Sequence, residues 1–200
     1  PSLSKALGEL LERLDFQPDV VVGHSAGAAI AMRMAIDGLI EPRQIVGLNA
    51  ALLPFGGSLR SIIAPMTQLF ATTRLMPALI ARRARDPKAI RRVLAGTGSR
   101  LDEDGVACYQ RLLQRENHVA AVLSMMASWA LEPLIADFDR VHTPLCLVVA
   151  DGDKAVSPRE GERVANRLSD ARVVHMQGVG HLAHEEQPAE VASIIKGAVL

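Results

Sequence analysis

Residues 19–36 read DVVVGHSAGAAIAMRMAI and combine three local patterns in one short stretch. Asp19 to Val22 is a β-branched run, which is typical of a buried strand. Ala28 to Ile36 is an apolar, alanine-rich run, which is typical of a helix packed on a sheet. Between them, Gly23 to Gly27 has the spacing G-x-S-x-G at a strand-to-helix turn. This context predicts a nucleophile elbow that presents the hydroxyl of Ser25.

The elbow constrains the residues around Ser25. A serine on so sharp a turn has a strained backbone, so the positions two before and two after it need small residues, and Gly23 and Gly27 meet that need. The Ala26 N–H lies at the positive end of the following helix, where we expect it to face an oxyanion. We expect His24 to line the pocket beside the nucleophile, with its side chain aimed away from the serine oxygen.

The composition predicts a globular protein with one substantial core. Of 200 residues, 49% are hydrophobic, and 22 Lys and Arg balance 22 Asp and Glu, so no net field favours nucleic acid or an anionic membrane. Cys108 and Cys146 lie far apart, which predicts no disulfide framework and a reducing compartment. No apolar run reaches about 18 residues, so we expect a cytoplasmic protein without a transmembrane segment.

Strand and helix patterns alternate on both sides of a long helical region. The first strand is expected at 19–23. Further strand-like runs occur at three places: 44–49, 144–150 and 172–176. Helical patterns outside the elbow and the central region lie at 2–15, 158–168 and 188–199. Because a helix connects the first two strands, we expect them to pair in parallel.

Residues 54–141 lack this alternation. The region carries helical patterns broken by prolines and glycines, and no convincing strand, so we expect a helical cap inserted into an α/β core made of residues 1–53 and 142–200. One short segment of it is strongly basic, with only Asp86 opposing; its basic members are Arg82, Arg83, Arg85, Lys88, Arg91 and Arg92. A solvated helix face and a docking patch for an acidic partner or an anionic substrate both fit this segment.

A serine nucleophile needs a base and a group that orients the base. In open parallel sheets such groups follow the carboxyl ends of strands. Asp153 and Asp151 both follow the third strand, and we favour Asp153 because Gly152 lets the chain turn before it and a helix starts soon after. Asn49, at the end of the second strand, occupies the other place for an orienting group but carries no charge.

The predicted base is His181, which follows the last strand. Its loop begins Gly178-Val179-Gly180, and these glycines allow it to reach back towards Ser25. We interpret His184 as a surface residue or a residue behind the site, and the Glu185-Glu186 pair as a cap of the final helix. These histidines and glutamates have no known metal spacing, so we expect neither a metal nor a cofactor.

The elbow, the Asp153 loop and the sequence GHLAHEEQP at 180–188 together resemble the α/β-hydrolase superfamily over the whole chain. Four segments are similar to one branch, the BchO-type magnesium-chelatase accessory proteins of bacteriochlorophyll biosynthesis: VGHSAGAAIAM (22–32), VGLNAALLPF (46–55), GTGSRL (96–101) and MMASW (125–129). The resemblance implies a Ser25, Asp153, His181 triad and a cap between the second and third strands. It also implies a role in the step that inserts magnesium into protoporphyrin IX.

The chain departs from the family pattern before the elbow. Family members carry several strands there and a His-Gly loop that supplies a second oxyanion N–H. The chain has neither, and so resembles the carboxyl-terminal two-thirds of such a protein, with the strand at 19–23 as an exposed hydrophobic edge. Because one missing oxyanion donor costs about 3 to 4 kcal/mol of transition-state stabilisation, we expect weak activity or none from this chain by itself.

Two functions are compatible with these features. The first is a serine hydrolase that acts on an ester or a similar acyl group of an apolar or tetrapyrrole-like substrate, in association with magnesium chelatase. The second is a non-catalytic accessory module whose cap and basic segment bind a porphyrin or a chelatase subunit. Dehalogenases and epoxide hydrolases of this fold use an aspartate nucleophile, so Ser25 argues against both.

Overall fold

The computed structural model describes residues 3–54 and 75–199 and divides the chain into two compact units. The first, called here the sheet unit, comprises residues 1–53, 97–99 and 131–200. The second, the helical unit, comprises residues 54–96 and 100–130. The inserted region predicted at 54–141 is therefore longer than the helical unit, because residues 97–99 and 131–141 belong to the sheet unit.

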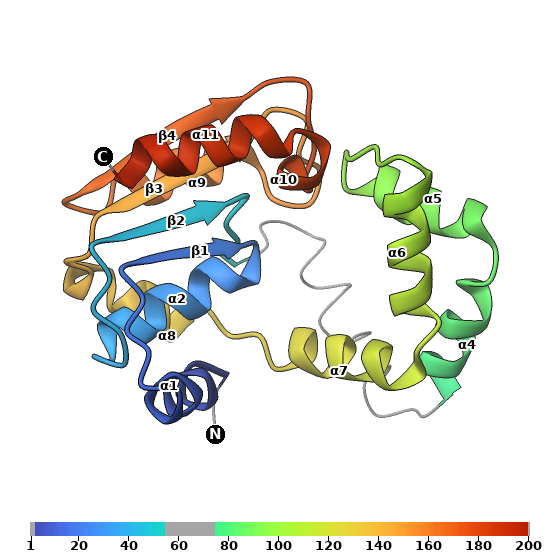
Figure 1. The fold of residues 1–200 in the computed structure, drawn as a ribbon, viewed down its shortest axis with the longest axis horizontal. Coiled ribbons are helices and arrows are strands. Elements are labelled where there is room, and N and C mark those ends of the chain that lie inside the picture. Colours follow the sequence, from blue (N-terminus) through green and yellow to red (C-terminus); the bar gives the residue numbers. More distant parts are fainter. Residues whose placement is uncertain (1–2, 55–74, 200) are drawn as a thin grey trace. The chain divides into compact units, whose positions relative to one another are not determined.

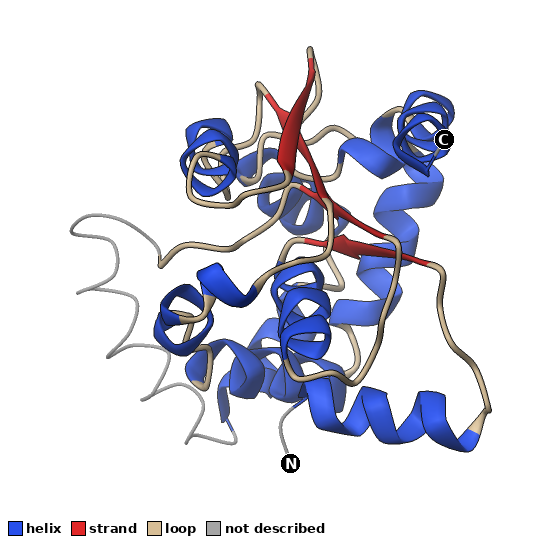
Figure 2. Ribbon diagram, turned by 90° about the vertical axis from the view of Figure 1, so that its left-hand side faces the viewer, coloured by secondary structure: helices blue, strands red, loops and turns tan. Residues whose placement is uncertain are grey.

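The sheet unit is built on four parallel strands in the same order in space as in the sequence. These strands are β1 (Val20–His24), β2 (Gln44–Leu48), β3 (Leu145–Ala150) and β4 (Ala171–Met176). Figure 1 shows them side by side, and Figure 2 shows the twist that accumulates from strand to strand. The predicted strands and their parallel pairing are confirmed, with boundaries shifted by one residue.

Both faces of this sheet are covered by helices, which explains why β3 is buried along its whole length. On one face, Gly47 lies against Ala28 of α2 (Ala26–Ile36), and Val149 lies against Gly161 of α9 (Pro158–Ala165). On the other face, α11 (Pro188–Val199) contributes to the buried cluster around Cys146. The β-branched and apolar runs of the strands therefore have partners on both sides.

One edge of the sheet is formed by β1, and helix α1 (Leu3–Arg13) precedes it in the chain. Helix α1 buries Ser4 and Gly8. Leu39 packs closely against Gly8, because the glycine has no side chain in the way. Three of the four leucines of α1 are exposed: Leu3, Leu7 and Leu10. Val22 of β1 is 44% exposed, as expected for an uncovered edge strand.

The helical unit contains four helices among its described residues: α4 (Leu75–Arg83), α5 (Pro87–Gly96), α6 (Glu103–Leu113) and α7 (Glu116–Ala127). Contacts join α4 to α7, α5 to α6, and α6 to α7. Asp102 caps α6, because its carboxylate accepts the Gly105 N–H at 2.8 Å. The described residues of this unit contain no strand, as predicted.

The residues after 130 return the chain to the sheet unit before β3 begins. They form α8 (Glu132–Ala136) and a 3₁₀ helix, Phe138–Arg140. Arg33 of α2 donates to the Asp137 carboxylate at 2.8 Å, which attaches this segment to the helix that follows the elbow. In the part of the chain that the structure describes, no helix has both the length and the apolar character that crossing a membrane requires.

Candidate active site

The carboxyl ends of the four strands bring the predicted site residues to one edge of the sheet. Ser25 follows β1, Asn49 follows β2, Asp153 lies just beyond β3, and His181 lies in the loop after β4. The parallel strands end at a common edge (Figure 1), so residues that follow them are brought together although they are far apart in the sequence.

Ser25 occupies the strained turn that its motif predicts. Its backbone has φ 51° and ψ −116°, a region that residues with a side chain rarely adopt. The turn is held by backbone hydrogen bonds on both sides. Ser25 donates its N–H to the Leu48 carbonyl at 2.9 Å, and its carbonyl accepts the N–H groups of Ala28 at 3.2 Å and Ala51 at 3.1 Å.

The two glycines of the motif serve different purposes. A Cβ on Gly23 would lie 2.6 Å from the backbone nitrogen of Ala28 and 2.7 Å from its Cα, so the strand and helix pass too closely for any side chain. A Cβ on Gly27 would meet no atom of the described residues within 4 Å outside its own stretch of helix. The prediction that Gly27 must be small for packing is therefore wrong, because the helix has already turned away from the strand at that position.

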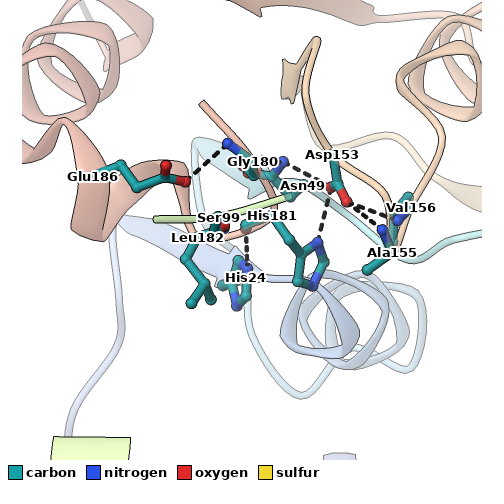
Figure 3. A network of polar contacts seen from close by, with 10 residues as sticks. All are labelled: His24, Asn49, Ser99, Asp153, Ala155, Val156, Gly180, His181, Leu182 and Glu186. Atoms are coloured by element: carbon teal, nitrogen blue, oxygen red, sulfur yellow. Dashed lines mark hydrogen bonds and ion pairs between the residues drawn. The ribbon is translucent and has the colours of Figure 1, made fainter. Parts of the chain in front are cut away.

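Asp153 and His181 form a buried pair. The Asp153 side chain is 1% exposed and that of His181 is 11% exposed, and His181 Nδ1 lies 2.8 Å from Asp153 Oδ2. The same carboxylate accepts three further hydrogen bonds, from Asn49 Nδ2 at 2.9 Å and from the N–H groups of Ala155 at 2.8 Å and Val156 at 2.9 Å (Figure 3). Every lone-pair direction of the carboxylate is thus occupied.

The hydrogen bonds around Asp153 determine its charge state and the tautomer of His181. Burial raises the pKa of Asp153, but the hydrogen bonds from His181 and the Val156 N–H, together with the one from Asn49, outweigh burial and leave that pKa below its ordinary value. An ionised carboxylate only accepts, so His181 Nδ1 must carry the proton. The Nε2 lone pair of the neutral ring is then available to accept a proton.

Asp151, the alternative to Asp153, does not reach His181. Its side chain is 49% exposed and lies 3.4 Å from Nδ1 of His175 on β4. The backbone turns at Gly152, so two carboxylates that are two positions apart face different neighbours.

Asn49 has a role that sequence reasoning considered only as a substitute for an acid. It is buried, has a positive φ of 47°, and donates to Asp153 rather than replacing it. A polar residue directly after a buried strand was the available signal, but the identity of its partner depends on the neighbouring strand.

His24 supports the His181 loop. Its Nε2 lies 2.9 Å from the carbonyl oxygen of His181, so Nε2 carries the proton and donates. The His24 ring also packs against the rings of His181 and His184, with centroids 4.8 Å and 4.4 Å apart. Burial lowers the pKa of His24 to about 4, and burial also lowers the pKa of His184. A pocket-lining role for His24 stays a prediction.

The lowered pKa of His24 predicts a loss of stability in mild acid. The unfolded chain binds a proton near the ordinary histidine pKa of about 6.5, whereas the folded protein binds it only near 4, so the free energy of unfolding should fall as pH drops through this range. Allowing for partial exposure, we expect a loss of about 2 kcal/mol. Urea unfolding between about pH 7.5 and about pH 4.5 measures it.

His24→Gln is the matched control for this experiment, because a glutamine amide can donate to the His181 carbonyl but does not titrate. The variant should show a shallower pH dependence than the native protein. Equal slopes would contradict the assignment. Asp153, whose pKa is lowered, loses its contribution only at more acidic pH and does not confuse the comparison.

Glu186 stabilises the loop before His181. Its Oε1 accepts the Gly180 N–H at 2.8 Å, from the short helix α10 (Ala183–Glu186) (Figure 3). From the sequence, the Glu185-Glu186 pair was expected to cap the last helix. The Glu186 carboxylate instead binds the loop that carries His181, the predicted base.

Comparison with known proteins shows which family the chain belongs to. Residues 3–194 match the model of the alpha/beta hydrolase family. The chain therefore belongs to the α/β-hydrolase family, and the predicted fold class, a parallel sheet flanked by helices, is confirmed.

One curated relative and two solved structures illustrate the similarity. The magnesium-chelatase 30 kDa subunit of Rhodobacter capsulatus is 37% identical over 183 residues, which cover 92% of this chain and 63% of the relative. An esterase from Exiguobacterium antarcticum superposes with a TM-score of 0.73 at 11% identity, over 98% of this chain and 72% of that one. The epoxide hydrolase CorEH superposes with a TM-score of 0.75 at 16% identity, again over 98% and 72%.

These structural neighbours show the fold of the chain but not its chemistry, which depends on the site residues. An esterase and an epoxide hydrolase both match at low identity, so backbone similarity does not select a reaction. The chain spans less than two thirds of the length of its curated relative.

Proposed function

We propose that the protein is a serine hydrolase in which Ser25 is the nucleophile, His181 the general base and Asp153 the group that orients it. The observation that carries this proposal is the buried Asp153–His181 pair, with its 2.8 Å contact, at the same sheet edge as the strained turn of Ser25. The pair holds its proton on Nδ1, which leaves Nε2 as the basic nitrogen that a serine nucleophile requires.

In the proposed reaction, Ser25 Oγ attacks the acyl carbon of an ester, and its proton moves to His181 Nε2. The Ala26 N–H, at the amino end of the 11-residue helix α2, donates to the oxyanion of the tetrahedral intermediate. The ester C–O bond breaks, and the alcohol leaves with the proton from Nε2. Water then gives a proton to Nε2 and attacks the acyl-serine, which releases the acid and returns the proton to Ser25.

The proposed substrate class and setting are supported by the name of the curated relative. Because a relative at 37% identity is named a magnesium-chelatase subunit, we place the substrate among esters or acyl groups of apolar or tetrapyrrole-like molecules, in the magnesium branch of bacteriochlorophyll biosynthesis. Magnesium-chelatase subunits in the cytoplasm are the proposed partners. No cofactor is needed, because a triad of this kind supplies nucleophile, base and orienting charge.

A fluorophosphonate probe tests the proposal on the natural protein, since it reacts with activated serines. We expect covalent labelling of the native protein, and a loss of at least about 10⁴-fold in the labelling rate of Ser25→Ala. Ser193→Ala, which changes an exposed serine of α11, should label like the native protein. Absence of labelling in the native protein, or equal labelling of Ser25→Ala, would reject the hydrolase.

A second function, a non-catalytic accessory role at magnesium chelatase, is favoured by the name of the relative and by one surface feature. A hollow of about 480 Å³ in the helical unit is lined by Leu79, Asp86 and three arginines, Arg82, Arg83 and Arg85. Basic side chains around an open hollow suit an anionic ligand or an acidic partner. Under this function Ser25→Ala leaves chelatase stimulation intact, whereas charge reversal at Arg82 and Arg83 removes it.

A further inference from the structure

The segment Thr97-Gly98-Ser99 joins α5 to α6 in the sequence but belongs to the sheet unit. We call it the 97–99 strap. The helical unit lies on both sides of it along the chain, so these three residues leave that unit and return to it within one turn. Groups of the sheet unit therefore hold the strap in place.

The strap contacts both loops that carry the proposed catalytic pair. The Thr97 carbonyl accepts the N–H of Lys154 at 3.1 Å and the N–H of His181 at 3.3 Å. The Ser99 hydroxyl accepts the N–H of Leu182 at 2.8 Å, and Ser99 is 1% exposed (Figure 3). The strap therefore binds the residue after Asp153, His181 itself and the residue after His181.

Glycines make this three-way contact possible. Gly98 has φ +88°, and a Cβ there would collide with the carbonyl oxygen of Gly152. A Cβ on Gly180 would collide with the Gly98 backbone, and one on Gly152 would lie 2.7 Å from the Val179 oxygen. The three backbones touch directly, so a shift of the strap cannot be absorbed by flexible side chains. Gly180 was expected to give its loop freedom, and the structure shows that it permits close packing instead.

We propose that the 97–99 strap is a positioning element for the Asp153–His181 pair, and that Ser99 is a positioning residue. The Thr97 carbonyl and the Ser99 hydroxyl fix the position of the His181 loop relative to the Asp153 loop. The 2.8 Å contact between Nδ1 and the carboxylate depends on that position. The effect on catalysis rests on the proposed function, whereas the effect on the pair itself does not.

The test is Ser99→Ala in the natural protein, read by proton NMR and by hydrogen exchange. The Nδ1 proton of His181 should give a low-field resonance that is absent in Asp153→Asn. In Ser99→Ala we expect this resonance to move upfield and to exchange faster with water. Amide exchange should rise about tenfold in residues 178–182 and 153–156 and stay unchanged in the helices of the helical unit, because one buried hydrogen bond is lost.

Two further variants separate positioning from general stability. Ser99→Cys keeps a weak acceptor of similar size, so it should show an intermediate shift, and it carries the test if Ser99→Ala fails to fold. Ser193→Ala should match the native spectrum. A native Nδ1 resonance and native exchange in Ser99→Ala, with only the free energy of unfolding lowered, would overturn the proposal.

These readouts are independent of hydrolysis. If the native protein were not labelled by the fluorophosphonate, the proposed function would fail while the NMR result still decided the role of the strap. If labelling occurs, its rate should fall about tenfold in Ser99→Ala, in step with the change in the resonance.

Discussion

Asp153→Asn is expected to lower the fluorophosphonate labelling rate of Ser25 by about 10⁴-fold without unfolding the protein. Asparagine keeps the shape of the side chain but removes the charge. It can also donate to His181 Nδ1, which would move the ring proton to Nε2 and block that nitrogen as a base. Four hydrogen bonds converge on the carboxylate and fix its position against His181. Labelling kinetics, with circular dichroism to confirm folding, provide the measurement.

The control for Asp153→Asn is Asp151→Asn, which changes an exposed carboxylate two positions away. This variant should label at a rate within about twofold of the native protein, since surface substitutions have small effects. Labelling of Asp153→Asn at the native rate would exclude an orienting role for that residue. Equal losses in both variants would indicate that the loop, rather than the carboxylate, matters.

Gly23→Ala is expected to destabilise the protein by about 3 kcal/mol or more, or to prevent folding. The new Cβ would lie 2.6 Å from the backbone nitrogen of Ala28 and 2.7 Å from its Cα, at the junction of β1 and α2. These two backbone atoms cannot move without disturbing the hydrogen bonds that hold Ser25 in its strained conformation. Urea unfolding measures the change in free energy.

Gly27→Ala is the paired control for this prediction. The site has open space among the described residues, and alanine favours a helix over glycine, so the free energy of unfolding should change by no more than about 1 kcal/mol. If both substitutions destabilised the protein equally, the steric account of the elbow would be wrong. The contrast matters because the two glycines are indistinguishable in the motif.

The arrangement of the sheet could be predicted from local patterns. Buried parallel strands are mainly apolar runs; the run that became β2 follows Pro42-Arg43 and ends before Asn49, and the run that became β3 follows Pro144 and ends before Asp151. The start of the last helix was predictable because Pro188 marks its first turn. The buried face of α1 was not predictable in this way, because Gly8 is buried for its lack of a side chain rather than for its hydrophobicity.

The candidate site divides in the same manner. The motif around Ser25 and the position of His181 after the last strand were visible as spacing along the chain. Asp153 was favoured as the partner of His181 from the turn at Gly152, whereas the donation from Asn49 and the support from His24 depend on how neighbouring strand ends face one another. Thr97 and Ser99 were noted only as part of a resemblance, since nothing local in GTGSRL indicates contact with two distant loops.

The sequence by itself determined the parallel strand pattern, the elbow at Ser25 and a histidine after the last strand, because hydrophobic runs and glycine spacing are properties of adjacent residues. The sequence also favoured Asp153 over Asp151 as the partner of that histidine, and the tertiary structure shows this contact. Only the tertiary structure decided that Asn49 and the 97–99 strap hold the pair. These hydrogen bonds join residues 104 and 83 positions apart, and their partners are selected by the packing of strand ends and glycine backbones rather than by any local pattern.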